Sequence, residues 1–329
     1  MKTELKTSLS FKKTLLILSL LCLLLGALCL ALGELLLPVS AALLAVIYVF
    51  DTTERRIFSY AVSAALILIN IAGLIFGITL SLFSIQAVII ALLICLSFRN
   101  GASKSDSSYL LTLICVAFIV LEGLLLAMAE VGEYTVDAAV SFYANLFDQL
   151  RAVFVNISLE MYGEIFAKAG VKLTSDVLET MFDAQLGLII SYLVIAAFGI
   201  VGITMKLFTA FSVKLAQDNR AILSWRFVTS NVFAYFYIIL LIASIFTTSA
   251  GGVFALTVNN LYNIFMAIYA YVGFNFAIAF LSSRMRPMFA FLIICIALLT
   301  FFSFGISLLA MIGVIFTLRI NNGPHPVEK

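Results

Sequence analysis

The sequence is poor in the residues and motifs that usually carry chemistry. Its only histidine, His325, lies in the polar tail of residues 321–329, so no histidine is available for a metal site or for catalysis within an apolar segment. The chain has no glycine-rich phosphate loop, no HExxH motif and no GxSxG motif. No aspartate lies deep in an apolar run, so an intramembrane aspartyl pair is missing as well. We therefore predict that the chain is not an enzyme and uses no metal ion or cofactor.

Cysteine is also placed in a way that argues against cross-links. All five cysteines lie inside apolar runs, and no two form a CxxC pair (Cys22, Cys29, Cys95, Cys115 and Cys295). Disulfide frameworks and thiolate zinc sites use closely spaced cysteines in polar segments. We interpret these cysteines as small apolar residues.

Charged residues are scarce, and their scarcity indicates whether water or lipid surrounds the chain. Only 11% of the 329 residues are charged, 64% are hydrophobic, and the mean hydropathy is +1.19. A soluble domain has about half apolar and a quarter charged residues. A water-soluble core cannot hide this much apolar surface, so the lipid bilayer is the predicted surrounding. No nucleic-acid partner is predicted.

Apolar runs long enough to cross a bilayer occur along most of the chain. We predict an all-α, polytopic integral membrane protein with nine or ten transmembrane helices. The expected spans are residues 14–32, 35–50, 57–74, 78–98, 109–129, 187–207, 227–246 and 253–281, followed by the run 287–318. This last run is one long tilted helix or two short helices folded at Phe304 and Gly305. The expected units are residues 1–129, 130–185, 186–320 and the tail 321–329.

The distribution of basic residues predicts the orientation. With a cytoplasmic N-terminus, the inside segments hold fourteen of the nineteen Lys and Arg residues (Lys2, Lys6, Lys12, Lys13, Arg55, Arg56, Arg99, Lys104, Lys206, Lys214, Arg220, Arg226, Arg284 and Arg286). Cytoplasmic loops carry such an excess of positive charge. Residues 130–185 are then extracytoplasmic, and an inside position of Arg319 favours ten spans over nine.

Residues 130–185 form the one long segment that is neither strongly apolar nor basic. Apolar residues recur there at helical spacing (Val136, Val140, Tyr143, Phe147, Leu150, Phe154, Ile157, Met161 and Ile165). We expect one helix ending at Ala169 and Gly170. Asp176 and Glu179 match a capping box that would open a second helix, running straight into the next span. The apolar stripe requires cover from the second helix, from the outer membrane surface, or from a partner or second copy through residues 136–168. Phe147, Phe154 and Met161 represent the candidate partner face.

Three polar residues within the spans are candidate contacts for a ligand. Glu122 is the one acid well inside an apolar run, and an acid in that position leans towards function. Asn259 and Asn263 are four residues apart, so they share one face of a helix, and Asn260 borders that face. The alternative for Glu122 is a neutral, hydrogen-bonded packing residue. For the asparagines the alternative is hydrogen bonding between helices.

The whole chain resembles the YybS-like family of bacterial multi-pass membrane proteins. The resemblance is carried by Trp225-Arg226-Phe227 before a span, by the Asn- and Tyr-containing span 253–281, and by Gly313 followed by Arg319. Here residues 314–318 read Val-Ile-Phe-Thr-Leu, where that family has an Asp. The family's function is not established, and its N-terminal block is similar to substrate-binding subunits of vitamin-type transporters. The resemblance implies a bacterial plasma-membrane location.

Two functions remain open from the sequence. The first is a transport-related or small-molecule-binding role within the bilayer, with Glu122, Asn259 and Asn263 facing one cavity. The second is a non-catalytic scaffold that recruits an envelope partner through the extracytoplasmic helices. The first requires an enclosed site between the two membrane blocks, and the second requires that Phe147, Phe154 and Met161 stay exposed.

Overall fold

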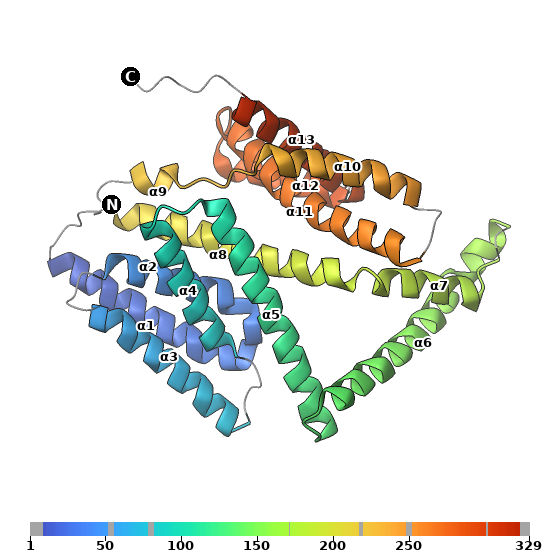
Figure 1. Cartoon of the computed structure of the whole chain (residues 1–329), viewed down its shortest axis with the longest axis horizontal. Coiled ribbons are helices and arrows are strands. Elements are labelled where there is room, and N and C mark those ends of the chain that lie inside the picture. The colour runs from blue at the N-terminus through green and yellow to red at the C-terminus, as the bar shows by residue number, and fades with distance from the viewer. Residues whose placement is uncertain are drawn as a thin grey trace.

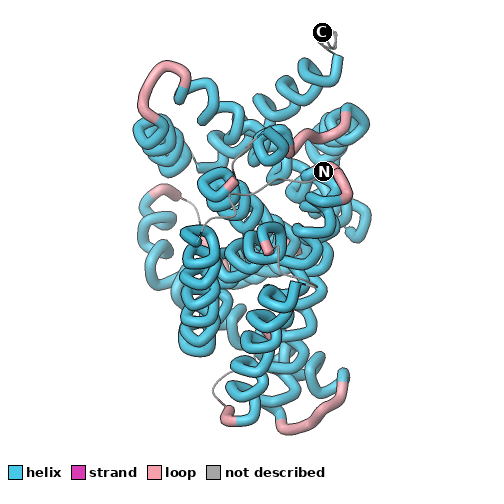
Figure 2. The backbone as a smooth tube through the Cα atoms, turned by 90° about the vertical axis from the view of Figure 1, so that its left-hand side faces the viewer, coloured by secondary structure: helices cyan, strands magenta, loops and turns pink. Residues whose placement is uncertain are grey.

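The chain folds into helices joined by short loops. The computed structural model describes residues 9–51, 56–77, 82–170, 172–216, 220–247, 252–300 and 302–322. Every regular element among these residues is a helix (Figure 2). The prediction of an all-α fold is therefore confirmed for the described part of the chain.

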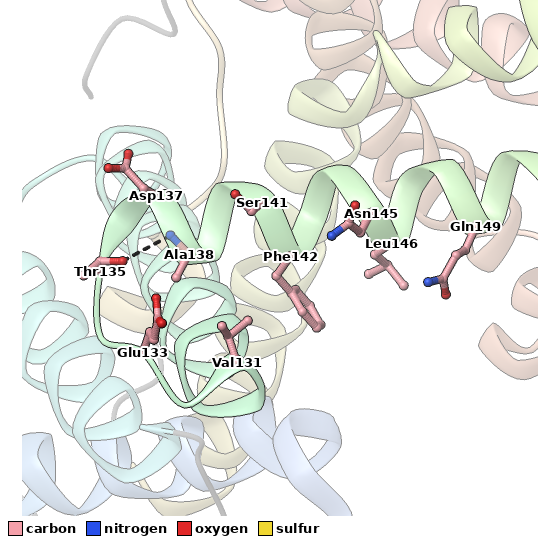
Figure 3. A pocket seen from close by; sticks show the side chains of 10 residues that line it. All are labelled: Val131, Glu133, Thr135, Asp137, Ala138, Ser141, Phe142, Asn145, Leu146 and Gln149. Atoms are coloured by element: carbon pink, nitrogen blue, oxygen red, sulfur yellow. Dashed lines mark hydrogen bonds between the residues drawn. The ribbon is translucent and has the colours of Figure 1, made fainter.

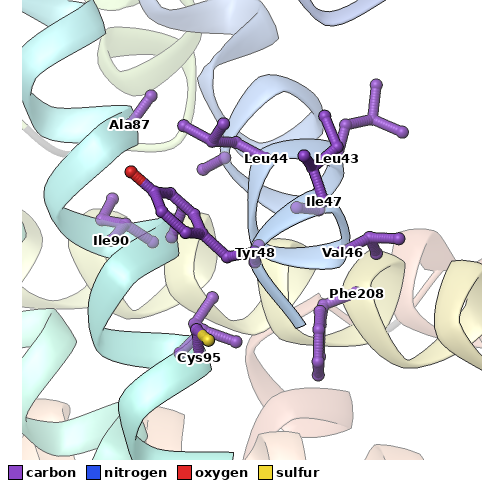
Figure 4. Close-up of a cluster of buried hydrophobic side chains, with 14 of the residues drawn as sticks. Leu43, Leu44, Val46, Ile47, Tyr48, Ala87, Ile90, Cys95 and Phe208 are labelled. Atoms are coloured by element: carbon purple, nitrogen blue, oxygen red, sulfur yellow. The ribbon is translucent and has the colours of Figure 1, made fainter. Parts of the chain in front are cut away.

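The first group of helices follows the predicted apolar runs closely. It consists of α1 (Leu9–Leu32), the short 3₁₀ helix η1 (Gly33–Leu36), α2 (Leu37–Phe50), α3 (Ile57–Ile75) and α4 (Phe83–Arg99). Pro38 stands at the start of α2, where its missing N–H costs no helical hydrogen bond. α2 is buried along nearly its whole length and forms the centre of this group. Leu44 and Tyr48 of α2 point towards Ala87 and Ile90 of α4 (Figure 4).

Four longer or linking helices come next. They are α5 (Lys104–Val131), α6 (Val136–Lys168), α7 (Ser175–Leu186) and α8 (Ile189–Leu215). α6 begins and ends where the apolar spacing predicts, and Gly170 adopts a positive φ of 77° just after it. The chain then continues through α9 (Arg220–Ser224), α10 (Asn231–Thr247), α11 (Gly252–Ser282), α12 (Pro287–Thr300) and α13 (Phe302–Asn322).

α8 lies between two groups of helices. Figure 1 shows α1 to α4 on one side of α8 and α10 to α13 on the other, with α5 crossing α8. α8 packs against α2 and α5 and also against α11. In the second group α11 and α13 are in close contact, because a Cβ atom at Gly273 or Gly313 would overlap the backbone of the other helix. The core of this group is formed by Tyr237, Tyr269, Ala310 and Val314.

Among the residues that the structure describes, five helices are long and apolar enough to cross a membrane. They are Ile57–Ile75, Lys104–Val131, Ile189–Leu215, Gly252–Ser282 and Phe304–Asn321. Shorter apolar helices of 10–17 residues lie at Leu16–Leu28, Leu37–Phe50, Phe83–Arg99, Asn231–Thr247 and Pro287–Ile296. These helices fit a protein embedded in a membrane, as the composition predicts.

Several local expectations differ from the structure. The run 287–318 forms two helices, α12 and α13, and α13 already begins at Phe302, before the fold expected at Phe304 and Gly305. Asp176 and Glu179 do not form a capping box, because α7 begins at Ser175 and both acids lie inside the helix. α7 also does not run straight into α8. It ends at Leu186, and α8 begins at Ile189.

Candidate functional site

Tyr109 lies where α5 meets the second group of helices. Its ring contacts Phe227 and Phe233 edge to face, with ring centroids 5.9 and 5.8 Å apart. Its hydroxyl is buried and has no hydrogen-bond partner among the residues that the structure describes. A buried hydroxyl without a partner costs about 1–3 kcal/mol. The position is therefore unfavourable unless something else supplies the hydrogen bond.

An apolar pocket of about 230 Å³ extends from Tyr109 between three helices. α5 contributes Thr112, Leu113 and Val116, which follow Tyr109 at helical spacing and so share its face. α8 and α11 supply the other walls, with the residues Val194, Ile195, Phe198, Ile264, Ala267 and Ile268. The walls come from α5 and α8, which link the two groups, and from α11 of the second group, so this pocket lies where the linking helices meet the second group.

A polar pocket of about 550 Å³ begins on the other side of Tyr109. It is formed by the start of α5, the segment before α10, the start of α10 and the end of α13. Hydroxyl and amide side chains dominate its lining, which consists of Ser103, Ser105, Asp106, Tyr109, Val228, Thr229, Ser230, Asn231, Phe233 and Asn321. Asp106 is the only charged residue among them. Tyr109 lines both pockets, so the polar and the apolar pocket are neighbours along one face of α5.

Hydrogen bonds between distant segments hold the polar pocket in shape. The Ser105 hydroxyl donates to the Val228 carbonyl, and the Val228 N–H donates to the Ser105 oxygen over 3.0 Å. The Asn321 amide donates to the Thr229 carbonyl over 3.0 Å and to the Asn231 side-chain oxygen over 2.9 Å. These bonds join α5 and α13 to the segment before α10. The pocket walls are therefore fixed by side chains that are far apart in the sequence.

The start of α5 is held in place by Lys104, which bonds to α8, and by Trp225, which bonds to the segment before α5. The Lys104 side chain is only 8% exposed, and its Nζ donates to the Thr209 hydroxyl over 2.9 Å. Nζ also lies 5.3 Å from the centroid of the Trp225 ring. The Trp225 indole N–H donates to the Ala102 carbonyl over 2.8 Å. The chain thus buries a lysine against an aromatic ring beside the polar pocket.

Glu122 contacts the start of α4. Its Oε1 atom accepts a hydrogen bond from the backbone N–H of Leu82, the residue that precedes α4. A carboxylate at a helix N-terminus is stabilised by the unpaired N–H groups and the helix dipole. Glu122 does not line the polar or the apolar pocket. The structure therefore places it in a helix-capping position, away from the junction at Tyr109.

Asn260, between the two predicted asparagines, makes the hydrogen bonds that join α11 to α8. Its Oδ1 atom accepts from the Ser191 N–H over 2.9 Å, and its Nδ2 atom donates to the Gly187 carbonyl over 2.8 Å. These backbone groups lie on either side of the break between α7 and α8. Asn260 is buried, whereas Asn259 and Asn263 are partly exposed and line neither pocket at Tyr109. Glu122, Asn259 and Asn263 are thus not brought together in either pocket.

α6 and α7 form a hairpin with a partly bare apolar surface. Arg151 pairs with Asp148 and Asp183, each over 2.8 Å, and the Asp183 hydrogen bond raises the pKa of the Arg151 guanidinium above its ordinary value. The Phe154 ring also contacts Phe182 of α7. Phe147 is half-buried, but Phe154 remains 37% and Met161 59% exposed.

A third pocket, of about 570 Å³, lies at the corner between α5 and α6. All its lining residues fall within residues 131–149. Figure 3 shows Asp137 and Ser141 on the other side of α6 from Phe142 and Leu146, so these side chains do not converge on one point. No group of three or more metal-binding side chains occurs among the described residues. The junction at Tyr109 is therefore the better candidate site.

Comparison of the chain with protein-family models, with curated proteins and with solved structures gives no match.

Proposed function

We propose that this chain is an integral membrane protein that binds an amphipathic small molecule where α5 and α8 meet its second group of helices. The observation that carries the proposal is the position of Tyr109, which lines a polar pocket and an apolar pocket at once. A ligand with a polar head and an apolar tail matches these two neighbouring spaces. Binding is the whole of this role, and no bond of the ligand is broken.

The lining of the polar pocket favours an uncharged, hydroxylated head group. Serine, threonine and asparagine side chains can each donate and accept hydrogen bonds, as hydroxyl groups do. Asp106 adds acceptor oxygens, and no lysine or arginine lines the pocket, which disfavours a phosphate head. We therefore name glycolipid-like and glycerolipid-like amphiphiles as the ligand class.

The proposal includes a membrane topology. Both the five long and the five shorter apolar helices cross the bilayer, which gives ten spans with a cytoplasmic N-terminus. The polar pocket then opens at the cytoplasmic surface, and the apolar pocket lies within the bilayer. α6 and α7 are extracytoplasmic in this arrangement. The proposed location is the bacterial plasma membrane, as the YybS-like resemblance implies.

A substitution that fills the apolar pocket tests this function. Octyl glucoside, which combines a sugar head with a short alkyl tail, serves as the probe in radiolabelled form below its micellar concentration. The full chain is placed in phosphatidylcholine nanodiscs, and empty discs give the background. Ala267→Phe is expected to weaken binding at least tenfold, since the larger ring occupies the space of the tail, and tenfold corresponds to about 1.4 kcal/mol.

Ile203→Phe is the matched control, because Ile203 is an exposed residue of α8 that lines neither pocket. This variant is expected to bind the probe as the unchanged protein does. Equal binding by Ala267→Phe and the unchanged protein would overturn the proposed function. Binding no greater than that of empty discs would also overturn it.

A further inference from the structure

The far half of α6 carries an exposed apolar stripe that its own hairpin leaves bare. Leu150, Phe154, Ile157, Met161 and Ile165 are all exposed. Their spacings of four, three, four and four residues place them along one face of the helix. The stripe extends over about 22 Å at 1.5 Å per residue. A continuous apolar strip of this kind is typical of an interaction surface.

α7 is already packed against a neighbouring side of α6. Val155 and Ser158 of α6 are buried, and so is Leu178 of α7. The ion pair between Arg151 and Asp183 fixes the position of the two helices at the base of the hairpin. Figure 1 shows the tip of the hairpin, at the end of α6 and the start of α7, extending away from both groups of helices. The second helix of the hairpin therefore contacts the stripe only at Phe154, through Phe182, and leaves the rest of it exposed.

Acidic residues border the stripe and set the charge of the hairpin. Glu160 and Glu164 lie next to Met161 and Ile165 on the surface of α6. Residues 136–186 contain seven acids and three bases, a net charge of −4 (Asp137, Asp148, Glu160, Glu164, Asp176, Glu179 and Asp183 against Arg151, Lys168 and Lys172). Arg151 is occupied by two aspartates, and Lys168 lies 4.0 Å from Glu164.

This charge distinguishes between the molecules that could cover the stripe. A second copy would bring a second hairpin of charge −4 against the first, and like charges across an interface are unfavourable. Helices that lie on anionic membranes are rich in lysine and arginine, the opposite of this one. A basic partner avoids both penalties, since its lysines or arginines can pair with Glu160 and Glu164. Recognition of an amphipathic helix by an apolar strip is a common mode of binding.

We propose that the stripe Leu150–Ile165 of α6 docks a basic amphipathic helix of about four turns from another envelope protein. The apolar face of that helix covers Phe154, Ile157 and Met161, and its basic residues lie against Glu160 and Glu164. This interaction is separate from ligand binding at Tyr109 and does not depend on it.

The experiment uses a 15-residue helical peptide of leucine and lysine as the probe. An analogue with glutamate in place of lysine has the same apolar face and the opposite charge. Binding of each to the full chain in phosphatidylcholine nanodiscs is measured by fluorescence anisotropy, with empty discs as background. We expect the lysine peptide to bind at least tenfold more tightly than the glutamate analogue, and to weaken as salt is added.

Two sets of variants locate the binding site on the chain. The double variant Ile157→Ser, Met161→Ser is expected to lose at least tenfold in affinity, whereas Val177→Ser on the exposed surface of α7 keeps it. Glu160→Gln with Glu164→Gln is expected to lose three- to tenfold, while Glu130→Gln with Glu133→Gln, outside the stripe, keeps it. Equal affinity for the two peptides, or equal losses in the control variants, would overturn the proposal.

A cysteine at position 157 tests the two other occupants directly. Efficient cross-linking of Ile157→Cys between two copies by a bismaleimide would show that a second copy, and not a basic partner, covers the stripe. Strong quenching of a fluorophore at this position by nitroxide-labelled lipid would show that the bilayer surface, and not a basic partner, covers the stripe. The proposal expects neither result, with Val177→Cys as the reference position for both measurements.

Discussion

Tyr109 combines an apolar environment with a hydroxyl that lacks a partner. Its aromatic contacts to Phe227 and Phe233 stabilise the ring, but its buried hydroxyl loses the hydrogen bonds that water would supply. Tyr48 is also a buried tyrosine, in the first group of helices, but its hydroxyl has a hydrogen-bond partner. Its hydroxyl lies 2.6 Å from the Ser63 hydroxyl, with which it shares a hydrogen bond. The two tyrosines therefore form a natural pair for comparison.

Removing the two hydroxyls is expected to have opposite effects on stability. Tyr109→Phe should stabilise the ligand-free protein by about 1 kcal/mol, because it removes an unsatisfied polar group. Tyr48→Phe should destabilise it by a similar amount, because it leaves Ser63 without this partner. Thermal unfolding of the full chain in nanodiscs measures both changes. A loss of stability in Tyr109→Phe would contradict our view of this residue.

At the scale of the element, the break between α7 and α8 depends on a side chain from a third helix. The Gly187 carbonyl and the Ser191 N–H lie on either side of the break, and Asn260 of α11 bonds to both. Broken helices in a bilayer need such partners for their freed backbone groups. A Cβ atom on Gly187 would lie 2.6 Å from the end of the Leu256 side chain, which would have to shift, so α11 packs closely here. The break therefore ties the hairpin to the second group of helices.

Replacement of Asn260 and replacement of its neighbour Asn259 should have very different effects on the stability of the protein. Asn260→Ala is expected to cost about 1–3 kcal/mol, since it leaves buried backbone groups without partners. It should also speed hydrogen exchange at the Ser191 amide. Asn259→Ala, one residue away and partly exposed, should change stability by less than about 0.5 kcal/mol. Similar unfolding temperatures for the two variants would show that the break is held in another way.

The elements also show how far the sequence predicts this fold. α6 follows from its own spacing of apolar residues, and Gly170 marks its end, so both bounds could be predicted locally. The break after α7 could not, because it depends on Asn260, more than seventy residues later. The junction at Tyr109 was missed for the same reason, as three distant segments build it. Its available signal was the excess of Ser, Thr and Asn in residues 103–108 and 229–231.

In the molecule as a whole, α5 and α8 link the first and the second group of helices. α8 packs on α2 in the first group and on α11 in the second, and α5 crosses it beside Tyr109. The proposed ligand therefore contacts the linking helices and the second group at once, from Leu113 on α5 to Ile264 on α11. Glu122 belongs to a different place, the start of α4, where a carboxylate stabilises the helix end. The central claim is that an amphiphile occupies the junction of α5 and α8 with the second group.

Photo-cross-linking tests this claim most directly. An octyl glucoside analogue with a diazirine in its alkyl chain is illuminated with the full chain in nanodiscs, and the modified residues are mapped by mass spectrometry. We predict labelling of residues 109–116, 194–198 and 264–268, reduced by excess unlabelled octyl glucoside and lost in Ala267→Phe. Labelling spread over exposed residues outside the pocket, such as Ile203 and Ile239, and unaffected by the competitor, would contradict the account.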